Sequence, residues 1–308
     1  MPFRLSRYFP ILEWGREYRR ETLVNDLIAA VIVTIMLIPQ SLAYAMLAGL
    51  PPQIGLYASI LPLIAYAIFG TSRTLAVGPV AILSLMTAAA AGKIAVPGSD
   101  AYVQAALILA FMSGAILFAL GLLRMGFLAN FLSHPVVSGF ITASGIIIAA
   151  SQLKHILGVE AGGHNLFEIV LALARSLPET SLPTLIIGGA SLVFLFGSRK
   201  FLKPLLLKAG LSEKAATIAT RTGPVFAVIV SILAVALLRL DEDGVRILGD
   251  VPRNLPDIGL PTFDRDTWMQ LAGSAALISL IGFVESVSVA QTLAAKRRQR
   301  VSPNQELI

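Results

Sequence analysis

The chain has 308 residues, of which 56% are hydrophobic and only 14% are charged, and its mean hydropathy is +0.79. A soluble domain carries about 25% charged residues, so this composition excludes a soluble globular protein and indicates an integral membrane protein. The net charge is +6, and the sequence contains no cysteine, which excludes disulfides, thiolate metal sites and cysteine nucleophiles.

The first 26 residues are basic and aromatic, with five arginines interleaved with Trp14 and two tyrosines. This pattern indicates a segment that lies at the cytoplasmic membrane surface. It lacks a short apolar core followed by a small-residue cleavage site, so no removable signal peptide is expected. We predict that residues 27–308 form an all-α transmembrane domain.

Eight apolar segments are predicted along this domain. They are residues 27–47, 54–69, 79–92, 102–123, 136–153, 182–196, 224–238 and 269–294. Residues 164–178 carry their polar side chains on one helical face, which indicates an amphipathic helix in the interface. Eight crossings place both ends on one side, and 17 of the 24 Lys and Arg residues then lie on that side. The positive-inside rule therefore predicts a cytoplasmic N-terminus.

The third apolar segment is too short to cross a membrane. It begins at Gly78-Pro79, and as a helix its 14 residues would span about 21 Å of a hydrocarbon core of about 30 Å. Pro79 suits the first helical position, where its missing N–H would be unpaired anyway. We predict a half-helix that starts within the membrane. The free N–H groups of Val80 and Ala81, together with the helix dipole, would attract an anion there.

Glu285 is the only acidic residue deep within a predicted span. A charged group is costly there, so it is a functional candidate by default, although a structural hydrogen-bonding role is the alternative. Desolvation disfavours the charged carboxylate, which makes Glu285 a candidate proton carrier.

Gln40 opens a stretch of the first span that matches the stretch after Glu285. Residues 40–45 and 285–290 share the order polar, Ser, aliphatic, small, larger apolar, Ala. Inverted-repeat transporters place corresponding polar helices around one central site. Tyr44 lies one turn after Gln40 and would close over a bound anion or, alternatively, pack within the bundle.

No motif for enzyme chemistry is present. The sequence has no HExxH, GxSxG or P-loop, and its three histidines lack metal-ligand spacing. The basic run at residues 296–300 follows an apolar span, so it reads as a stop-transfer anchor and not as a nucleic-acid site. We therefore expect no metal, no cofactor and no nucleic-acid partner, and a membrane enzyme is the least favoured class.

Three short motifs in this order resemble the signature of the SulP sulfate-permease family, which includes pendrin and prestin. They are residues 55–57, 69–73 and 77–79, and the likeness extends to residues 39–40, 283–286 and 302–307. The sequence departs from the family at Ile54, where an aromatic residue is usual. It also departs at Val289, where a sodium-coupled member would offer a hydroxyl, so protons are expected as the coupling ion.

The resemblance implies a 7+7 inverted-repeat fold with core and gate domains, usually followed by a STAS domain. The anion would bind between the half-helices of spans 3 and 10. The chain ends before span 9, so it would hold the first repeat and span 8, without the second half-helix or a STAS domain.

We therefore predict a secondary transporter of the bacterial cytoplasmic membrane, homodimeric when intact. It would move a small anion, sulfate first, with protons by an elevator-like mechanism. The predicted anion-binding residues are Gln40, Tyr44, Gly78, Pro79, Val80 and Ala81, and Glu285 is the predicted proton-coupling residue. A bicarbonate or dicarboxylate carrier, an anion channel on the same fold and a truncated non-transporting fragment are the alternatives.

Overall fold

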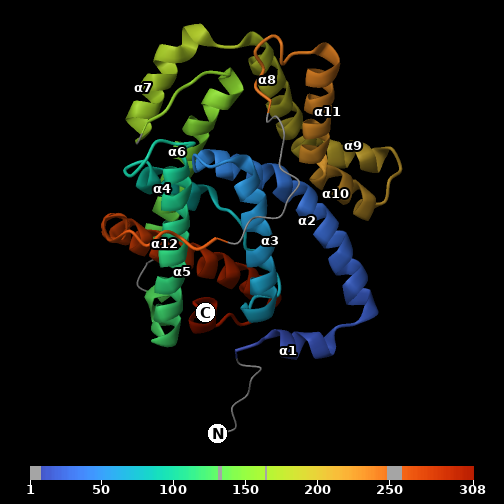
Figure 1. Cartoon of the computed structure of the whole chain (residues 1–308). Helices are drawn as coiled ribbons and strands as arrows, with labels where there is room; N and C mark the ends of the chain where they lie inside the picture. Colours follow the sequence, from blue (N-terminus) through green and yellow to red (C-terminus); the bar gives the residue numbers. More distant parts are fainter. Residues whose placement is uncertain (1–7, 131–133, 164, 248–258) are drawn as a thin grey trace. The chain divides into compact units, whose positions relative to one another are not determined.

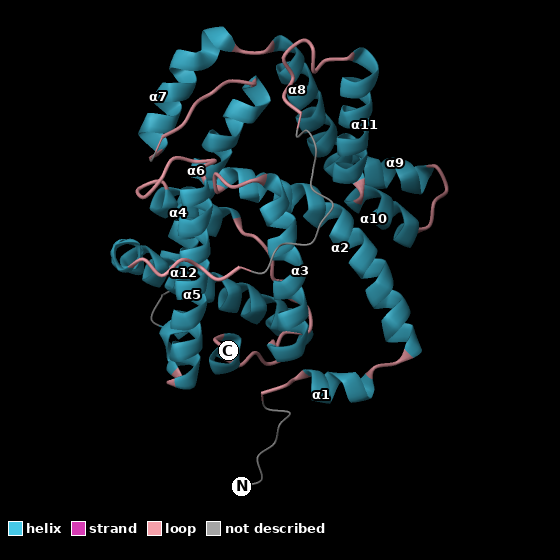
Figure 2. Cartoon of the chain, viewed as in Figure 1, coloured by secondary structure: helices cyan, strands magenta, loops and turns pink. Residues whose placement is uncertain are grey.

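The computed structural model describes residues 8–130, 134–163, 165–247 and 259–308, and the regular structure in these ranges is helical (Figures 1 and 2). Within them, five helical stretches are long and apolar enough to cross a membrane. They are α2 (Arg20–Leu47), α3 (Pro52–Phe69), α5 (Asp100–Leu122), the stretch Leu182–Lys208 and α12 (Arg265–Arg297). Shorter apolar helices are α4 (Ala81–Ala91), Gly145–Leu157 within α6 (His134–Leu157), and α11 (Gly223–Leu238). The prediction of an all-helical, multi-pass membrane protein is confirmed.

Two regions contain more helix than predicted. The span predicted at residues 182–196 continues through α8 (Leu182–Gly197), a π-helical turn η5 (Ser198–Leu202) and α9 (Lys203–Lys208). The short helix α10 (Glu213–Arg221) then follows, in a stretch for which no helix was predicted. The helix predicted at residues 164–178 is present as α7 (Leu166–Ser176), although His164 lies outside the described residues. The interfacial position of α7 stays a prediction.

The remaining elements are short helical turns near the ends of the longer helices. They are α1 (Ile11–Trp14), η2 (Gly15–Glu17), η3 (Met125–Asn130), η4 (Leu177–Glu179) and α13 (Pro303–Glu306).

The chain divides into two compact units, which are described separately. Unit 1 comprises Met1–Val24, Gln40–Ile141 and Val251–Ile308, and unit 2 comprises Asn25–Pro39 and Thr142–Asp250. These bounds divide α2 twice, after Val24 and after Pro39, and the second division falls at the proline inside that helix. Proline removes a backbone hydrogen bond from a helix interior, so this is a natural place for the division. The boundary predicted after residue 26 stays a prediction.

The core of unit 1 forms where α12 crosses α5 and both pack against α4 (Figure 1). Small residues allow this close approach, since Ala91 of α4 and Ala275 of α12 are fully buried. The Ser279 hydroxyl of α12 reaches the Ser113 hydroxyl of α5 at 3.0 Å. The larger side chains that fill the core are Tyr102, Ile108, Leu109, Leu271 and Ile278.

Side-chain caps fix where the two long helices of this core begin. The Ser99 hydroxyl accepts from the N–H of Tyr102 at the start of α5. At the start of α12, an Asp264 carboxylate oxygen accepts from the Thr267 hydroxyl at 2.6 Å and from the Thr267 N–H at 3.0 Å. These bonds lower the pKa of Asp264. The cap also explains why α12 begins at Arg265, four residues before the predicted start at residue 269.

Contacts within each unit agree with the predicted alternation of the spans. In unit 1, the Gln305 amide donates to the carbonyl oxygens of Tyr8 and Phe69, so three segments predicted on the inner side meet. In unit 2, Arg246 and Glu160 form an ion pair at 2.8 Å, and both lie in segments predicted on the outer side. Which side faces the cytoplasm stays a prediction.

Candidate functional site

The half-helix is present as α4, but it begins at Ala81, two residues later than predicted. Val80 is its N-cap, with an extended backbone at φ −125° and ψ 137°, and the Ser84 N–H donates to the Val80 carbonyl. The prediction that Pro79 is the first helical residue is therefore wrong. Gly78 and Pro79 belong to a connector, residues 70–80, that precedes the helix. The β-branched Val80 takes the extended conformation that its side chain favours, which delays the helix start.

The N-terminus of α4 offers backbone donors that helix geometry leaves without an acceptor inside the helix. The helix has 11 residues and a length of about 16 Å, well short of a hydrocarbon core of about 30 Å. Its first N–H groups have no intrahelical acceptor, and no side chain caps them from Val80. Ala81 and Ile82, which carry two of these donors, are buried. An anion is the natural partner for such a group of donors.

Glu285 lies on α12 close to the start of α4. It is half-buried, and its Oε2 atom is buried without a hydrogen-bond partner in the part of the chain that the structure describes. One turn earlier, Gly282 approaches Leu83 of α4 so closely that a Cβ atom on Gly282 would lie 3.2 Å from a Leu83 methyl group. The two helices therefore touch beside the carboxyl group.

The depths of Glu285 and the α4 N-terminus match. The far end of α4, at Ala91, shares a core with α12 residues that precede Gly282, so the two helices run antiparallel. Along the axis of α4, Ala81 lies about 3 Å before Leu83. Along the axis of α12, Glu285 lies about 4.5 Å after Gly282. Both steps lead in the same direction. Ala81 and Glu285 therefore lie at similar depths along two helices that are in contact. That they belong to one site stays a prediction.

Gln40 and Tyr44 are held by a different contact. Gln40 is exposed and Tyr44 half-buried, while the neighbouring Ser41 is fully buried. The Ser41 and Ser59 hydroxyls lie 2.6 Å apart, and Gly55 allows α3 to approach the Ser41 carbonyl. The contacts that fix this part of α2 are thus with α3, and the roles predicted for Gln40 and Tyr44 stay predictions.

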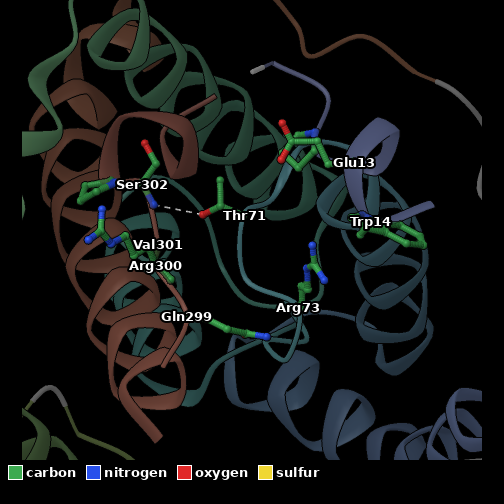
Figure 3. Close-up of a pocket in the computed structure, with 10 residues that line it drawn as sticks. Glu13, Trp14, Thr71, Arg73, Gln299, Arg300, Val301 and Ser302 are labelled. Carbon is green, nitrogen blue, oxygen red and sulfur yellow. Dashed lines mark hydrogen bonds between the residues drawn. The ribbon is translucent and has the colours of Figure 1, made fainter. Parts of the chain in front are cut away.

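An open cavity of 710 Å³ lies beside the start of the connector (Figure 3). Arg73, for which we considered anion attraction or a structural role, lines this cavity and pairs with Glu17 at 3.3 Å. Both side chains are at least half exposed, so this pair contributes little to stability. The other side of the cavity is formed by residues 299–303, which lead into α13.

Sequence reasoning missed the side chain of Glu306 on α13. Its carboxylate accepts from the Tyr66 hydroxyl at 2.7 Å and from the Thr71 N–H at 2.9 Å, more than 230 residues away in sequence. The signal available was Ser302-Pro303, a typical N-cap and first-turn pair, directly after a basic anchor. That signal predicts a helical turn but not its partners.

The fold defines a multi-pass membrane protein in which one apolar helix, α4, is too short to cross the membrane. Residues 23–308 match the model of the Sulfate permease family, and the chain belongs to this family. The resemblance drawn from the sequence motifs is thereby confirmed.

Two relatives and one solved structure illustrate the match. Over 306 residues the chain is 36% identical to "Sulfate transporter 4.1, chloroplastic" of Arabidopsis thaliana, covering 98% of this chain and 43% of that protein. It is 35% identical to a "Probable sulfate transporter" of Mycobacterium tuberculosis, covering 95% of this chain and 49% of that protein. The structure of SLC26A9 superposes with a TM-score of 0.83 at 26% identity, covering 99% of this chain and 49% of that chain. The chain thus spans about half the length of the relatives it matches.

Proposed function

We propose that this protein is a secondary active transporter that moves a small anion, sulfate first, across the cytoplasmic membrane of a bacterium. Membership of the Sulfate permease family and the names of the two relatives support sulfate. The observation that carries the proposal is the buried Oε2 atom of Glu285, which has no hydrogen-bond partner among the described residues and lies one turn after the contact of α12 with the first turn of α4. A transporter, and not an enzyme, is the activity that this arrangement supports.

The proposed site couples a proton to the anion by charge. The N–H groups at Ala81 and Ile82 would bind the oxyanion, because the helix dipole favours negative charge there. An ionised Glu285 would repel that anion, whereas a protonated Glu285 would not. Anion and proton would therefore enter together and leave together. We propose that unit 1, which carries both groups, moves as one body in an elevator-like cycle, and that the intact protein is a homodimer.

Uptake of radiolabelled sulfate into proteoliposomes tests this function. The intact protein should accumulate sulfate above its outside concentration when the pH is lower outside, and should stop when a protonophore removes the gradient. Unlabelled bicarbonate, chloride and a dicarboxylate, each added as competitor, would identify a different preferred anion. Uptake that never exceeds electrochemical equilibrium for sulfate would instead indicate a channel, and no uptake of any of these anions would contradict the proposal.

A further inference from the structure

The segment Ser302–Glu306, here called the α13 latch, folds back from the end of α12 onto other parts of unit 1. Glu306 uses both carboxylate oxygens. Oε2 accepts from the Tyr66 hydroxyl at 2.7 Å, and Oε1 accepts from the Thr71 N–H at 2.9 Å and from the Thr71 hydroxyl. Three donors from one short stretch therefore converge on a single acid.

Neighbouring residues of the latch reinforce this attachment. The Ser302 N–H donates to the Thr71 hydroxyl at 3.2 Å, the bond drawn across the cavity in Figure 3. The buried Gln305 amide donates to the Phe69 carbonyl, one of the carbonyls that the end of α3 leaves without a helical partner. Asn304 accepts from the Gly126 N–H at 2.7 Å and so attaches to η3 instead. The Gln305 amide also donates to the Tyr8 carbonyl at 3.1 Å. The latch thus has three attachments, to residues 66–71, to η3 and to Tyr8.

The first attachment lies at the start of the connector that leads to α4. Thr71 is the second residue of this connector, and beyond it the N–H groups of Thr74 and Leu75 donate to the nearby Ser72 hydroxyl. The connector is not helical, and the open cavity borders it at Thr71 and Arg73. The latch therefore ties Thr71 to another element of unit 1, and the exposed Arg73–Glu17 pair is a second, weaker tie of the connector.

The same helix, α12, holds both ends of the connector. At its middle, Gly282 contacts Leu83 in the first turn of α4, and its end continues through residues 298–301 into the latch. Loss of the latch would release the start of the connector while leaving the contact at Gly282 in place. The freed connector would then no longer constrain the backbone at Val80 and Ala81.

We propose that Glu306 is a positioning residue that holds the connector so that the α4 N–H groups stay aimed at the anion. This inference rests on the proposed function, because it assigns the latch to the same site. The printed partners of Glu306 are Tyr66 and Thr71, which precede α4, so it acts through Thr71 and the connector.

Three variants of the intact protein in proteoliposomes test this role. Glu306→Ala removes all three bonds and should raise the KM for sulfate about tenfold, with kcat per folded protein changed less than twofold. Glu306→Gln keeps the length of the side chain and a carbonyl oxygen that accepts from Thr71. The glutamine NH2 group can donate to the Tyr66 hydroxyl, so this variant should keep most of the wild-type affinity. Asn304→Ala removes only the attachment to η3 and is the matched control, with an unchanged KM.

Hydrogen exchange of the same proteins gives a readout that does not need transport. Glu306→Ala should speed exchange at residues 72–83, and Asn304→Ala should not. An unchanged KM and unchanged exchange in Glu306→Ala would overturn the proposal, as would an equal rise of KM in Asn304→Ala. If the wild-type protein takes up no anion, the proposed function fails. The role of the latch is then tested by exchange alone, and it is rejected if residues 72–83 exchange no faster in Glu306→Ala than in the wild type.

Discussion

Units 1 and 2 are both built from apolar helices, but they differ in how closely those helices pack. In unit 1, α4, α5 and α12 share a core in which Ala91 and Ala275 are fully buried. In unit 2, α8 has no buried residue and α11 has only Gly223 and Ala227. Buried contacts hold backbone positions firmly, because a packed core does not deform continuously. The site-bearing elements thus lie in the unit whose helices are fixed against one another.

Unit 2 keeps much of its apolar surface uncovered. An open groove of 550 Å³ runs between α8 and α11 and is lined almost entirely by apolar side chains, including Phe194 and Phe226. A weak contact between the Ser191 and Ser231 hydroxyls, 3.4 Å apart, is its polar element. Such a surface is stable in a membrane, where lipid is as apolar as the side chains. The difference teaches that helix length and hydropathy alone do not show which spans build a site.

The largest effect is expected from Gly55→Ala in unit 1. A Cβ atom at Gly55 would lie 1.9 Å from the Ser41 carbonyl oxygen, so α2 and α3 would have to separate. We expect little or no folded protein by size-exclusion chromatography. The matched changes Gly114→Ala on α5 and Gly189→Ala on α8 meet no atom within 4 Å and should fold normally. Normal folding of Gly55→Ala would show that the packing of unit 1 is looser than described.

Ala81→Pro should weaken anion binding about 10- to 100-fold, the effect of losing one hydrogen bond to a charged group. Proline fits the first helical position and demands an extended residue before it, and Val80 already has that backbone. The variant therefore removes an N–H with little change of the fold. Val80→Ala, which alters a side chain and keeps every N–H, is the control. Calorimetric titration with sulfate measures both, and unchanged affinity in Ala81→Pro would remove α4 from the site.

The orientation of unit 2 can be tested by labelling, because the chain has no cysteine of its own. Asp243→Cys should react with an impermeant thiol reagent added outside intact cells, and Lys208→Cys should react only after permeabilisation. Both positions are exposed, so access to the reagent depends on the side of the membrane. Labelling of Lys208→Cys alone in intact cells would reverse the predicted orientation.

The smallest effect is expected at the cap of α12. The Thr267 hydroxyl and N–H hold the pKa of Asp264 below its usual range, so the ionised cap stabilises the folded protein above about pH 4. That contribution is lost as the pH falls through the lowered pKa. Asp264→Asn caps without titrating. The melting temperature of the wild type, measured in detergent, should therefore approach or fall below that of Asp264→Asn as the pH drops from 7 to 3, and a constant difference would contradict this.

The sequence predicted the long helices because their apolar runs are far longer than a strand or loop would allow. It also predicted α4 from its short length, but it placed the start two residues early. Pro79 fits a first helical residue as well as it fits an extended segment, and only the backbone at Val80 decides between them. The local sequence therefore does not fix the first residue of a helix to better than about one turn.

The sequence placed Ala81 and Glu285 in one site from the cost of a charge within the membrane and from the dipole of a short helix. The structure adds a contact between the two helices at Gly282 and Leu83, and the shared site stays a prediction. The latch could not be predicted in the same way. Glu306 meets Thr71 only because the end of α12 leads back to the start of the connector, and no periodicity links residues 235 positions apart. The inverted repeat implied by the family resemblance stays a prediction.

Glu285→Gln tests the central claim most directly, that one site in unit 1 binds both the anion and the proton. The glutamine keeps the size of the side chain and carries no charge, as a protonated Glu285 would. In the intact protein, this variant should bind sulfate with wild-type affinity by calorimetry, and its uptake into proteoliposomes should no longer be stimulated by an inward proton gradient. Glu160→Gln, which changes an exposed acid of unit 2, should keep that stimulation. If Glu285→Gln still accumulates sulfate with the wild-type dependence on pH, Glu285 is structural and the claim is wrong.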